Sequence, residues 1–294
     1  MRVTHLGSHQ AALTRINSRL TEYAATQDKL ASGKRLRRPS DDPIGMNRAL
    51  ELRASLRARE QEGRNAADGK MWMDLADSKL QDVVAQLQRA RELAVRGATY
   101  TGPQEREAIA QEIGQLRDDI VGLANSTHQG RGLFSGFSAG DAVQKVAGTW
   151  TYVGDGGQIN RRVSESEVVA INVTADVAFG FTAGTDVFTV LDNLEAALYA
   201  DDTVGVETAL ANVDNGLQTV LGGLGIIGAR TNQVETAMAR NADDVITITQ
   251  QLSSLEDVDI AEAVMELQLQ QTAYEAALAS FAQSSQTSLV DFLR

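Results

Sequence analysis

The chain has 294 residues, is 43% hydrophobic, contains no cysteine and carries a formal net charge of −12. This apolar content is sufficient for a core, so disorder throughout is excluded, as are disulfides and cysteine-ligated metal sites. No apolar run reaches the 18 residues that would cross a bilayer, and the N-terminus lacks the apolar segment of a cleaved secretory signal. We therefore expect no membrane partner and no signal-peptide cleavage.

The charge is divided unevenly along the chain. Residues 1–140 contain 21 Lys and Arg against 17 Asp and Glu, whereas residues 141–294 contain 6 against 22. This division predicts that the basic first part pairs with the acidic last part, within or between subunits. Nucleic acid is the rival partner, but no aromatic residues interleave the basic cluster, so we expect no nucleic-acid binding. The cluster comprises Lys34, Arg35, Arg37, Arg38, Arg48, Arg53, Arg57 and Arg59.

In the N-terminal region, apolar residues recur every three or four positions, a spacing that predicts a helix with one apolar seam. The seam comprises Leu13, Ile16, Leu20, Tyr23, Gln27 and Leu30. Gly33 stands where a glycine in the left-handed conformation ends a helix. After the turn at residues 39–43, Asp42 is the expected N-cap of the next helix and Pro43 its first residue.

Two further helices are expected before the middle of the chain. The second helix covers residues 43–96, and the third begins at Pro103 and ends near residue 125. Heptad spacing supports both, with the seam residues Met73, Ala76, Leu80, Val83, Leu87, Ala90, Ala94, Ile109, Ile113, Leu116, Ile120 and Leu123.

A β-rich insert is expected between these helices and the C-terminal part. Glycine-rich turns such as residues 154–157 separate short runs rich in β-branched or aromatic side chains. The three runs are residues 149–153, 158–163 and 167–173.

The C-terminal part contains the longest apolar stripe, whose strict 4,3 spacing is the 3.5-residue period of a coiled-coil seam. Its members are Leu210, Val213, Leu217, Val220, Leu224, Ile227, Thr231, Val234, Met238, Asn241, Val245, Ile248, Leu252 and Leu255. Asp259 is the expected cap of a last helix. That helix has its own seam of Ile260, Val264, Leu267, Gln271, Tyr274, Leu278 and Phe281.

The expected fold class is mainly α: a long antiparallel coiled-coil or helical-bundle rod built from both chain ends, with a small β-rich insert. Three domains are expected. Residues 1–42 with 257–294 form a terminal helical domain for assembly, residues 43–135 with 186–256 a helical rod, and residues 136–185 the outer β-rich insert.

Two motifs suggest chemistry that their context contradicts. Residues 223–228, GLGIIG, match the dinucleotide-binding glycine pattern, but that pattern requires a preceding strand, and here the coiled-coil seam continues through it. His5 and His9 have the spacing of two metal ligands on a helix, yet no third ligand is near. We therefore assign no catalytic residue, no cofactor and no metal.

Two separated segments resemble the bacterial flagellin family. Residues 30–45, LASGKRLRRPSDDPIG, are similar to its N-terminal signature, and residues 227–232, IGARTN, with residues 257–263, DVDIAEA, to its C-terminal part. Within that family, three segments resemble the branch that joins hook and filament, namely residues 130–136 (GRGLFSG), 152–157 (YVGDGG) and 288–293 (SLVDFL).

The resemblance implies a structural protein of the bacterial flagellum, exported unfolded by the type III apparatus without a cleaved signal and assembled outside the cell. It would form the junction ring between hook and filament and template flagellin assembly. The implied partners are further copies of the chain in a ring, a second hook-associated junction protein, flagellin and an export chaperone. Flagellin itself, a soluble coiled-coil adaptor and, with least support, an enzyme are the alternatives.

The two terminal helices are predicted to be the assembly surface, because isolated helices with little apolar area are marginal in water. We expect their seams to be satisfied mainly by neighbouring subunits, and the helices to fold on assembly. The proposed interface residues are Leu13, Ile16, Leu20, Tyr23, Leu30, Ile260, Val264, Leu267, Tyr274, Leu278 and Phe281.

Overall fold

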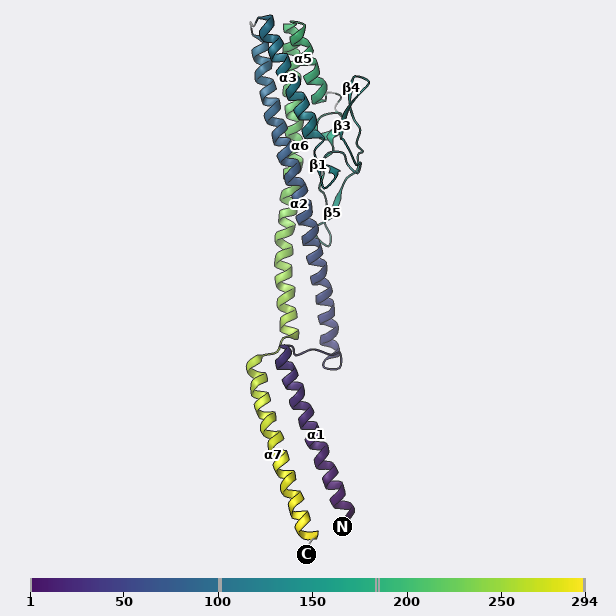
Figure 1. Ribbon diagram of the computed structural model, residues 1–294, viewed down its shortest axis with the longest axis vertical. Helices are drawn as coiled ribbons and strands as arrows, with labels where there is room; N and C mark the ends of the chain where they lie inside the picture. Colours follow the sequence, from purple (N-terminus) through teal and green to yellow (C-terminus); the bar gives the residue numbers. More distant parts are fainter. Residues whose placement is uncertain (1, 100–101, 183, 185, 293–294) are drawn as a thin grey trace. The chain divides into compact units, whose positions relative to one another are not determined.

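Helices form most of the structure, a computed structural model that describes residues 2–99, 102–182, 184 and 186–292 (Figure 1). The side chains of residues 2–6, 8, 9 and 283–292 lie outside the described part. The helices are α1 (Arg2–Ser32), α2 (Pro43–Ala98), α3 (Pro103–Ala124), α4 (Ala175–Ala178), α5 (Val187–Tyr199), α6 (Thr203–Glu256) and α7 (Ile260–Phe292). The strands are β1 (Thr127–His128), β2 (Arg131–Gly132), β3 (Val143–Val146), β4 (Thr149–Tyr152), β5 (Asn160–Arg162) and β6 (Val168–Ala170). The predicted class, mainly α with a small β-rich region, is confirmed.

The chain divides into two compact units. One consists of Met1–Arg57 with Val245–Arg294, and the other is Ala58–Asp244. Both boundaries fall inside helices, so α2 and α6 each contribute to both units. The division into three domains expected from the sequence, residues 1–42 with 257–294, 43–135 with 186–256, and 136–185, remains a prediction.

Within Ala58–Asp244, helices α2 and α6 run antiparallel and are joined along their length by ion pairs. Arg91 Nε lies 2.6 Å from Asp214 Oδ1, and Lys70 Nζ lies 3.1 Å from Glu235 Oε1. Between them lies the predicted coiled-coil seam of α6. Its fully buried members recur every seven residues and are Val213, Val220, Ile227, Val234 and Asn241. The 3.5-residue period therefore marks the face of α6 that packs against the core.

The polar members of this seam have specific partners. Asn241 is buried, and its Nδ2 donates to the main-chain oxygen of Arg59 on α2 at 2.9 Å. Thr231 Oγ1 lies 3.8 Å from the sulfur of Met73. A shift of α6 along α2 is disfavoured, because it would separate the buried Asn241 amide from the Arg59 carbonyl and leave the amide unpaired.

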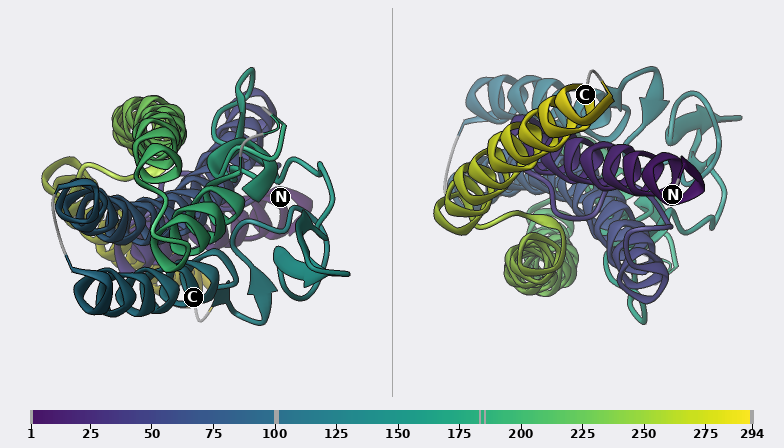
Figure 2. Two further views of the ribbon diagram at one scale, coloured as in Figure 1. Left: turned by 90° about the horizontal axis from the view of Figure 1, so that it is seen from above. Right: turned by 90° about the horizontal axis from the view of Figure 1, so that it is seen from below.

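The strands form three separate antiparallel pairs, β1–β2, β3–β4 and β5–β6, which gather at one side of the helices (Figure 2). Val143 pairs with Tyr152 in the second hairpin, and Asn160 pairs with Ala170 in the third. The predicted runs are confirmed as β4, β5 and β6, although each strand is shorter than its run. Strands β1, β2 and β3 have no such run, because their short segments lack alternation that a sequence pattern can detect.

Helix α5, which had not been assigned from the sequence, anchors this region. It packs along α3, and its buried Phe188 contacts the rings of Phe179 and Trp150 at centroid distances of 5.4 and 5.5 Å. Asp192 of the same helix accepts from Trp150 Nε1 at 2.9 Å and also pairs with Arg117 of α3 at 2.7 Å. The β-rich region thus shares one hydrophobic core with the helices.

In the other unit, α1 packs against α7, and the predicted helix ends are confirmed. Gly33 has a φ of +66°, the left-handed conformation that ends α1. Asp42 Oδ1 accepts from the main-chain N–H of Gly45 at 2.9 Å, and Asp259 Oδ1 accepts from that of Ala261 at 2.9 Å. Both carboxylates therefore cap the helices that follow them.

Replacing Phe188 by alanine is expected to lower the free energy of unfolding by about 3–5 kcal/mol, because the cavity lies among rings that cannot collapse into it. Denaturant unfolding of the full chain measures the change. Tyr199→Ala, at the 52% exposed end of the same helix, is the matched control and should change stability by less than about 0.5 kcal/mol. Equal losses in the two variants would contradict the placement of the core.

Candidate assembly surface

Helices α1 and α7 expose much of their apolar surface. Of the interface residues proposed from the sequence, Ile16 alone is buried within the chain. Those lying half-buried are Tyr23, Leu30, Leu267, Tyr274 and Phe281. Those exposed are Leu13, Leu20, Ile260, Val264 and Leu278. The structure thus covers one stripe of each helix by the other and leaves the remaining side chains in solvent.

Two further apolar side chains of α7 escaped the sequence analysis. Met265 and Leu269 are 64% and 70% exposed, and lie one helical turn apart on a face that the heptad seam does not include. Ile260, 66% exposed, lies on another part of the same helix. A helix that is apolar on several faces is ordinarily enclosed by neighbours. Following the heptad pattern identified the seam of α7. Counting apolar residues around the whole helix would also have identified the face that carries Met265 and Leu269.

The connection between α1 and α2 is bound to the connection between α6 and α7. Main-chain N–H groups of Arg35 and Val258 donate to the carbonyls of Glu256 and Gly33, at 2.6 and 3.0 Å. Lys34 and Asp257 form an antiparallel bridge between the two segments. These bonds define a joint, consisting of residues 33–36 and 255–258, from which α1 and α7 begin to pack.

Glu256 is the centre of the joint. Its side chain is only 2% exposed, and Oε2 lies 2.8 Å from Arg53 and 3.3 Å from Lys34. The other oxygen, Oε1, is buried and has no hydrogen-bond partner among the described residues. A buried carboxylate needs both cations, because the cost of removing it from water is repaid only by close opposite charge.

The outer ion pair of the joint lies in solvent. Lys34 Nζ is 2.7 Å from Asp257 Oδ1, and both side chains are more than 40% exposed. The hydrogen bond from Lys34 lowers the pKa of Asp257, and the same bond raises the pKa of Lys34. Both shifts favour the charged forms, so the pair is present across the neutral range.

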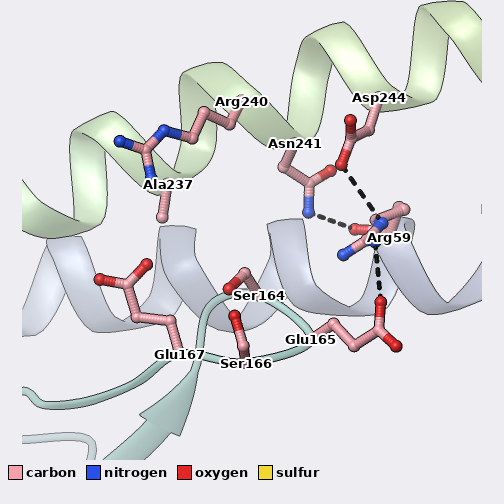
Figure 3. A pocket seen from close by; sticks show the side chains of 9 residues that line it. All are labelled: Arg59, Ser164, Glu165, Ser166, Glu167, Ala237, Arg240, Asn241 and Asp244. Atoms are coloured by element: carbon pink, nitrogen blue, oxygen red, sulfur yellow. Dashed lines mark hydrogen bonds and ion pairs between the residues drawn. The ribbon is translucent and has the colours of Figure 1, made fainter.

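A polar pocket of about 260 Å³ lies in the other unit, where the turn between β5 and β6 meets α2 and α6 (Figure 3). Arg59 dominates it, with Glu62, Glu165 and Asp244 at 2.9, 3.2 and 3.4 Å. Glu167 accepts from Gln233 at 2.7 Å. Glu165, Glu167 and Asp244 line the pocket together with the cations Arg59 and Arg240. Because three carboxylates already neutralise Arg59, its ion pairs hold the turn on the helices.

The two glycine-rich motifs at residues 130–136 and 152–157 contact each other through Asp155. Asp155 Oδ1 accepts from the N–H groups of Phe137 and Gly157 at 2.6 and 3.0 Å, and its own N–H donates to Ser135 O at 3.1 Å. Gly136 has a φ of +72°, and an added Cβ would collide with Asp155. Two segments noted separately in the sequence therefore form one structural element.

The glycine motif at residues 223–228 lies inside helix α6, as predicted, and the element directly before α6 is helix α5 rather than a strand. The side chains of His5 and His9 lie outside the described part. Among the described side chains, no three His, Asp or Glu come close enough to hold a metal ion. No helix, over the same residues, is long and apolar enough to span a bilayer.

Comparison with known proteins identifies relatives along the chain. Models of the bacterial flagellin N-terminal and C-terminal helical regions match residues 3–139 and 205–293. Flagellar hook-associated protein 3 of Escherichia coli (strain K12) is 29% identical, covering 96% of this chain and 96% of that protein. Flagellin of Bacillus subtilis (strain 168) is 28% identical and covers 97% of both.

Solved structures share the fold at lower identity. The crystal structure of Xanthomonas campestris FlgL has a TM-score of 0.62 and 20% identity, covering 68% of this chain and 99% of that one. FlgL of Legionella pneumophila, described as the flagellar junction protein, also has a TM-score of 0.62, with 16% identity and coverage of 71% and 99%.

The joint predicts an asymmetry between its charges. Replacing Lys34 and Arg53 together by methionine leaves the Glu256 carboxylate buried without a cation, which is expected to cost about 3 kcal/mol. Glu256→Gln should cost about 1 kcal/mol, because the two cations are more than 40% exposed and hydrate freely. Amide exchange at Arg35 and Val258 reports opening of the joint.

Lys70→Met, which removes a half-buried cation of α2 outside the joint, serves as the control and should leave these amides unchanged. Exchange that is faster in Glu256→Gln than in the double variant would show that the buried carboxylate is not the costly charge.

Proposed function

Because the chain belongs to the bacterial flagellin family, we propose that this structural protein of the flagellum forms the junction between hook and filament. The observation that carries the proposal is the uncovered apolar surface of the terminal helices, with Leu269 and Ile260 largely in solvent. A large exposed apolar patch on a single chain marks a surface that another protein covers, as an assembling subunit requires. The contact of residues 130–136 with 152–157 supports the junction branch, since both segments resemble it.

The mechanism is completion of an unfinished helical core by neighbouring copies. Burying one leucine contributes about 2 kcal/mol, so several such side chains on α1 and α7 shift two marginal helices toward the ordered, assembled state. Before assembly the helices have only each other, and such small packings are marginal. Assembly outside the cell would thus be coupled to folding of the chain ends, which keeps them unassembled during export.

The partners follow from that surface. Copies of the chain would form a ring, with a second hook-associated junction protein on one side and flagellin on the other. An export chaperone would cover the terminal helices inside the cell. The role needs no catalytic residue and no cofactor, because it consists of binding and templating only. We propose export without a cleaved signal, as the resemblance to the flagellin family implies.

Flagellin is the second candidate. The match to the Bacillus subtilis flagellin covers 97% of both chains at 28% identity, close to the value for the hook-associated protein. Copy number separates the two roles: thousands of copies along the appendage indicate the filament subunit, whereas a single ring at the end of the hook indicates the junction.

Deleting the gene tests the role directly. We expect cells that carry hooks without filaments and shed flagellin into the medium, visible by electron microscopy and by blotting of the supernatant. Reintroducing the gene should restore filaments. Cells that lack this protein yet retain full filaments would exclude the junction role. Deletion cells that have neither filaments nor flagellin in the medium would favour the second candidate, because the deleted gene would then encode the filament subunit itself.

The apolar surface yields a prediction at single residues. Leu269→Asp and Leu278→Asp are each expected to abolish assembly, because a carboxylate buried at a subunit contact is not compensated. The melting temperature should stay within about 2 °C of the unmodified chain, since both side chains are exposed before assembly. Complementation of the deletion strain in a motility assay measures assembly.

Gln268→Asp is the matched control, because it adds the same charge at an exposed polar position of α7. Motility is expected to persist in this variant. Normal motility in Leu269→Asp and Leu278→Asp together would mean that this face of α7 is not an assembly contact.

A further inference from the structure

Helix α7 has carboxylates but no cations to pair with them. Glu262, Glu266 and Glu275 are exposed, and none forms an ion pair within the described part of the chain. Among the described residues, Glu266 and Glu275 accept from glutamine side chains of their own helix, at 3.0 and 3.1 Å. Although α1 carries basic residues and packs against α7, the described contacts between these helices include no ion pair.

A cavity of about 90 Å³ in the same unit has the opposite charge. Its polar lining consists of Asp28, Lys29, Arg35, Arg37, Arg38 and Asp41, from the end of α1 and the connection that follows. Four cations and two carboxylates therefore surround it. A cavity this small takes the end of one side chain, well below the roughly 300–1,000 Å³ of metabolite pockets.

Both carboxylates of the cavity are already engaged. Asp28 Oδ2 pairs with Arg37 at 3.2 Å. Asp41 Oδ2 accepts from the main-chain N–H groups of Arg37 and Arg38, at 3.1 and 2.9 Å, and these bonds lower its pKa. Its charge is thus fixed within the turn that it closes.

Three of the cations lack a matched anion. Arg35 donates to the main-chain oxygen of Leu255 at 2.9 Å, a neutral group. Lys29, Arg35 and Arg38 form no ion pair among the residues that the structure describes. The cavity therefore presents excess positive charge in a partly enclosed site, which favours a carboxylate over a neutral group.

We propose that the cavity receives the Glu262 and Glu266 edge of α7 from a second copy of this chain. The two glutamates are four residues apart and lie on one side of the helix, so one can enter the cavity while the other lies along its rim. The inference rests on the proposed assembly of copies and names the contact that orients them. Such a contact is head to tail, because the basic and acidic surfaces are different parts of each copy. Its repetition builds a ring when the rotation between copies closes, and a helical filament when it does not.

The charge of the whole chain opposes association between copies, and the proposed contact counters it locally. Copies that each carry a net charge of −12 repel one another, and added salt would relieve that repulsion. A local basic cavity facing a local acidic edge reverses the sign at the point of contact and steers docking. The proposal therefore predicts that salt slows assembly, whereas repulsion alone predicts that salt accelerates it.

Charge reversal of the full chain tests the contact. Lys29→Glu with Arg38→Glu makes the basic surface acidic, and Glu262→Lys with Glu266→Lys makes the acidic edge basic. Each pair of changes is expected to slow oligomer formation roughly tenfold or more, as measured by light scattering. A chain with all four changes restores opposite charges and should assemble again.

Matched controls keep the result specific. Arg131→Glu with Asp119→Lys reverses two exposed charges of Ala58–Asp244 and should leave assembly unchanged. Melting temperatures of the monomers distinguish a contact between copies from a contact within one chain. If the contact lies within one chain, each charge-reversed variant should have a lower melting temperature than the unmodified monomer. Loss of assembly that the four-change chain does not recover would overturn the proposal.

The absence of native cysteine permits a direct second measurement. In a mixture of Arg38→Cys and Glu262→Cys chains, mild oxidation should yield a disulfide-linked heterodimer, and a mixture of Arg131→Cys with Glu262→Cys should not. If copies assemble but neither the cross-link nor the charge effect occurs, the named contact is wrong while the proposed function stands. If the unmodified chain never assembles, the proposed function itself fails.

Discussion

The arrangement of this protein depends on apolar surface that one chain cannot cover. Helices α1 and α7 cover one stripe of each other, but Leu269, Met265 and Ile260 stay in solvent. Since buried apolar area is the main favourable term in folding, helices left half-covered are only marginally stable. The uncovered apolar surface that leaves these helices marginally stable in one chain also drives association between chains.

Some charges of the protein are paired within the chain, and others remain without a partner among the described residues. Glu256 is buried against Lys34 and Arg53, so this part of the basic-acidic pairing predicted from the sequence occurs within one chain. The remaining cations near Arg38 and the carboxylates near Glu262 have no such partner among the described residues. The two ion pairs of the buried Glu256 fix the joint, whereas the charges without a partner are available to select and orient a neighbour. Apolar side chains supply affinity, and charges supply direction.

Local signals predicted much of the fold because each acts over a few residues. Gly33, Asp42 and Asp259 end or begin helices through bonds to their immediate neighbours, and the structure has all three as predicted. The seam of α6 was equally readable, because its burial repeats with the period of the pattern. Helix α5 and the first three strands were missed, since they depend on contacts such as Phe188 with Phe179 that join distant segments. Met265 and Leu269 were missed because only one stripe of α7 was traced.

By itself, the sequence determined the helical class, the helix ends, the long seam and the family, since periodicity, capping and motif order are written into neighbouring residues. The tertiary structure decided which charges meet. Glu256 and Arg53 are separated by 203 residues, and no local pattern specifies that their side chains lie 2.8 Å apart. It also decided that Asp155 joins two glycine motifs and that Lys29, Arg35 and Arg38 of the small cavity form no ion pair among the described residues. Those outcomes depend on how whole helices pack, because a side chain's partners are set by the surfaces that burial brings together.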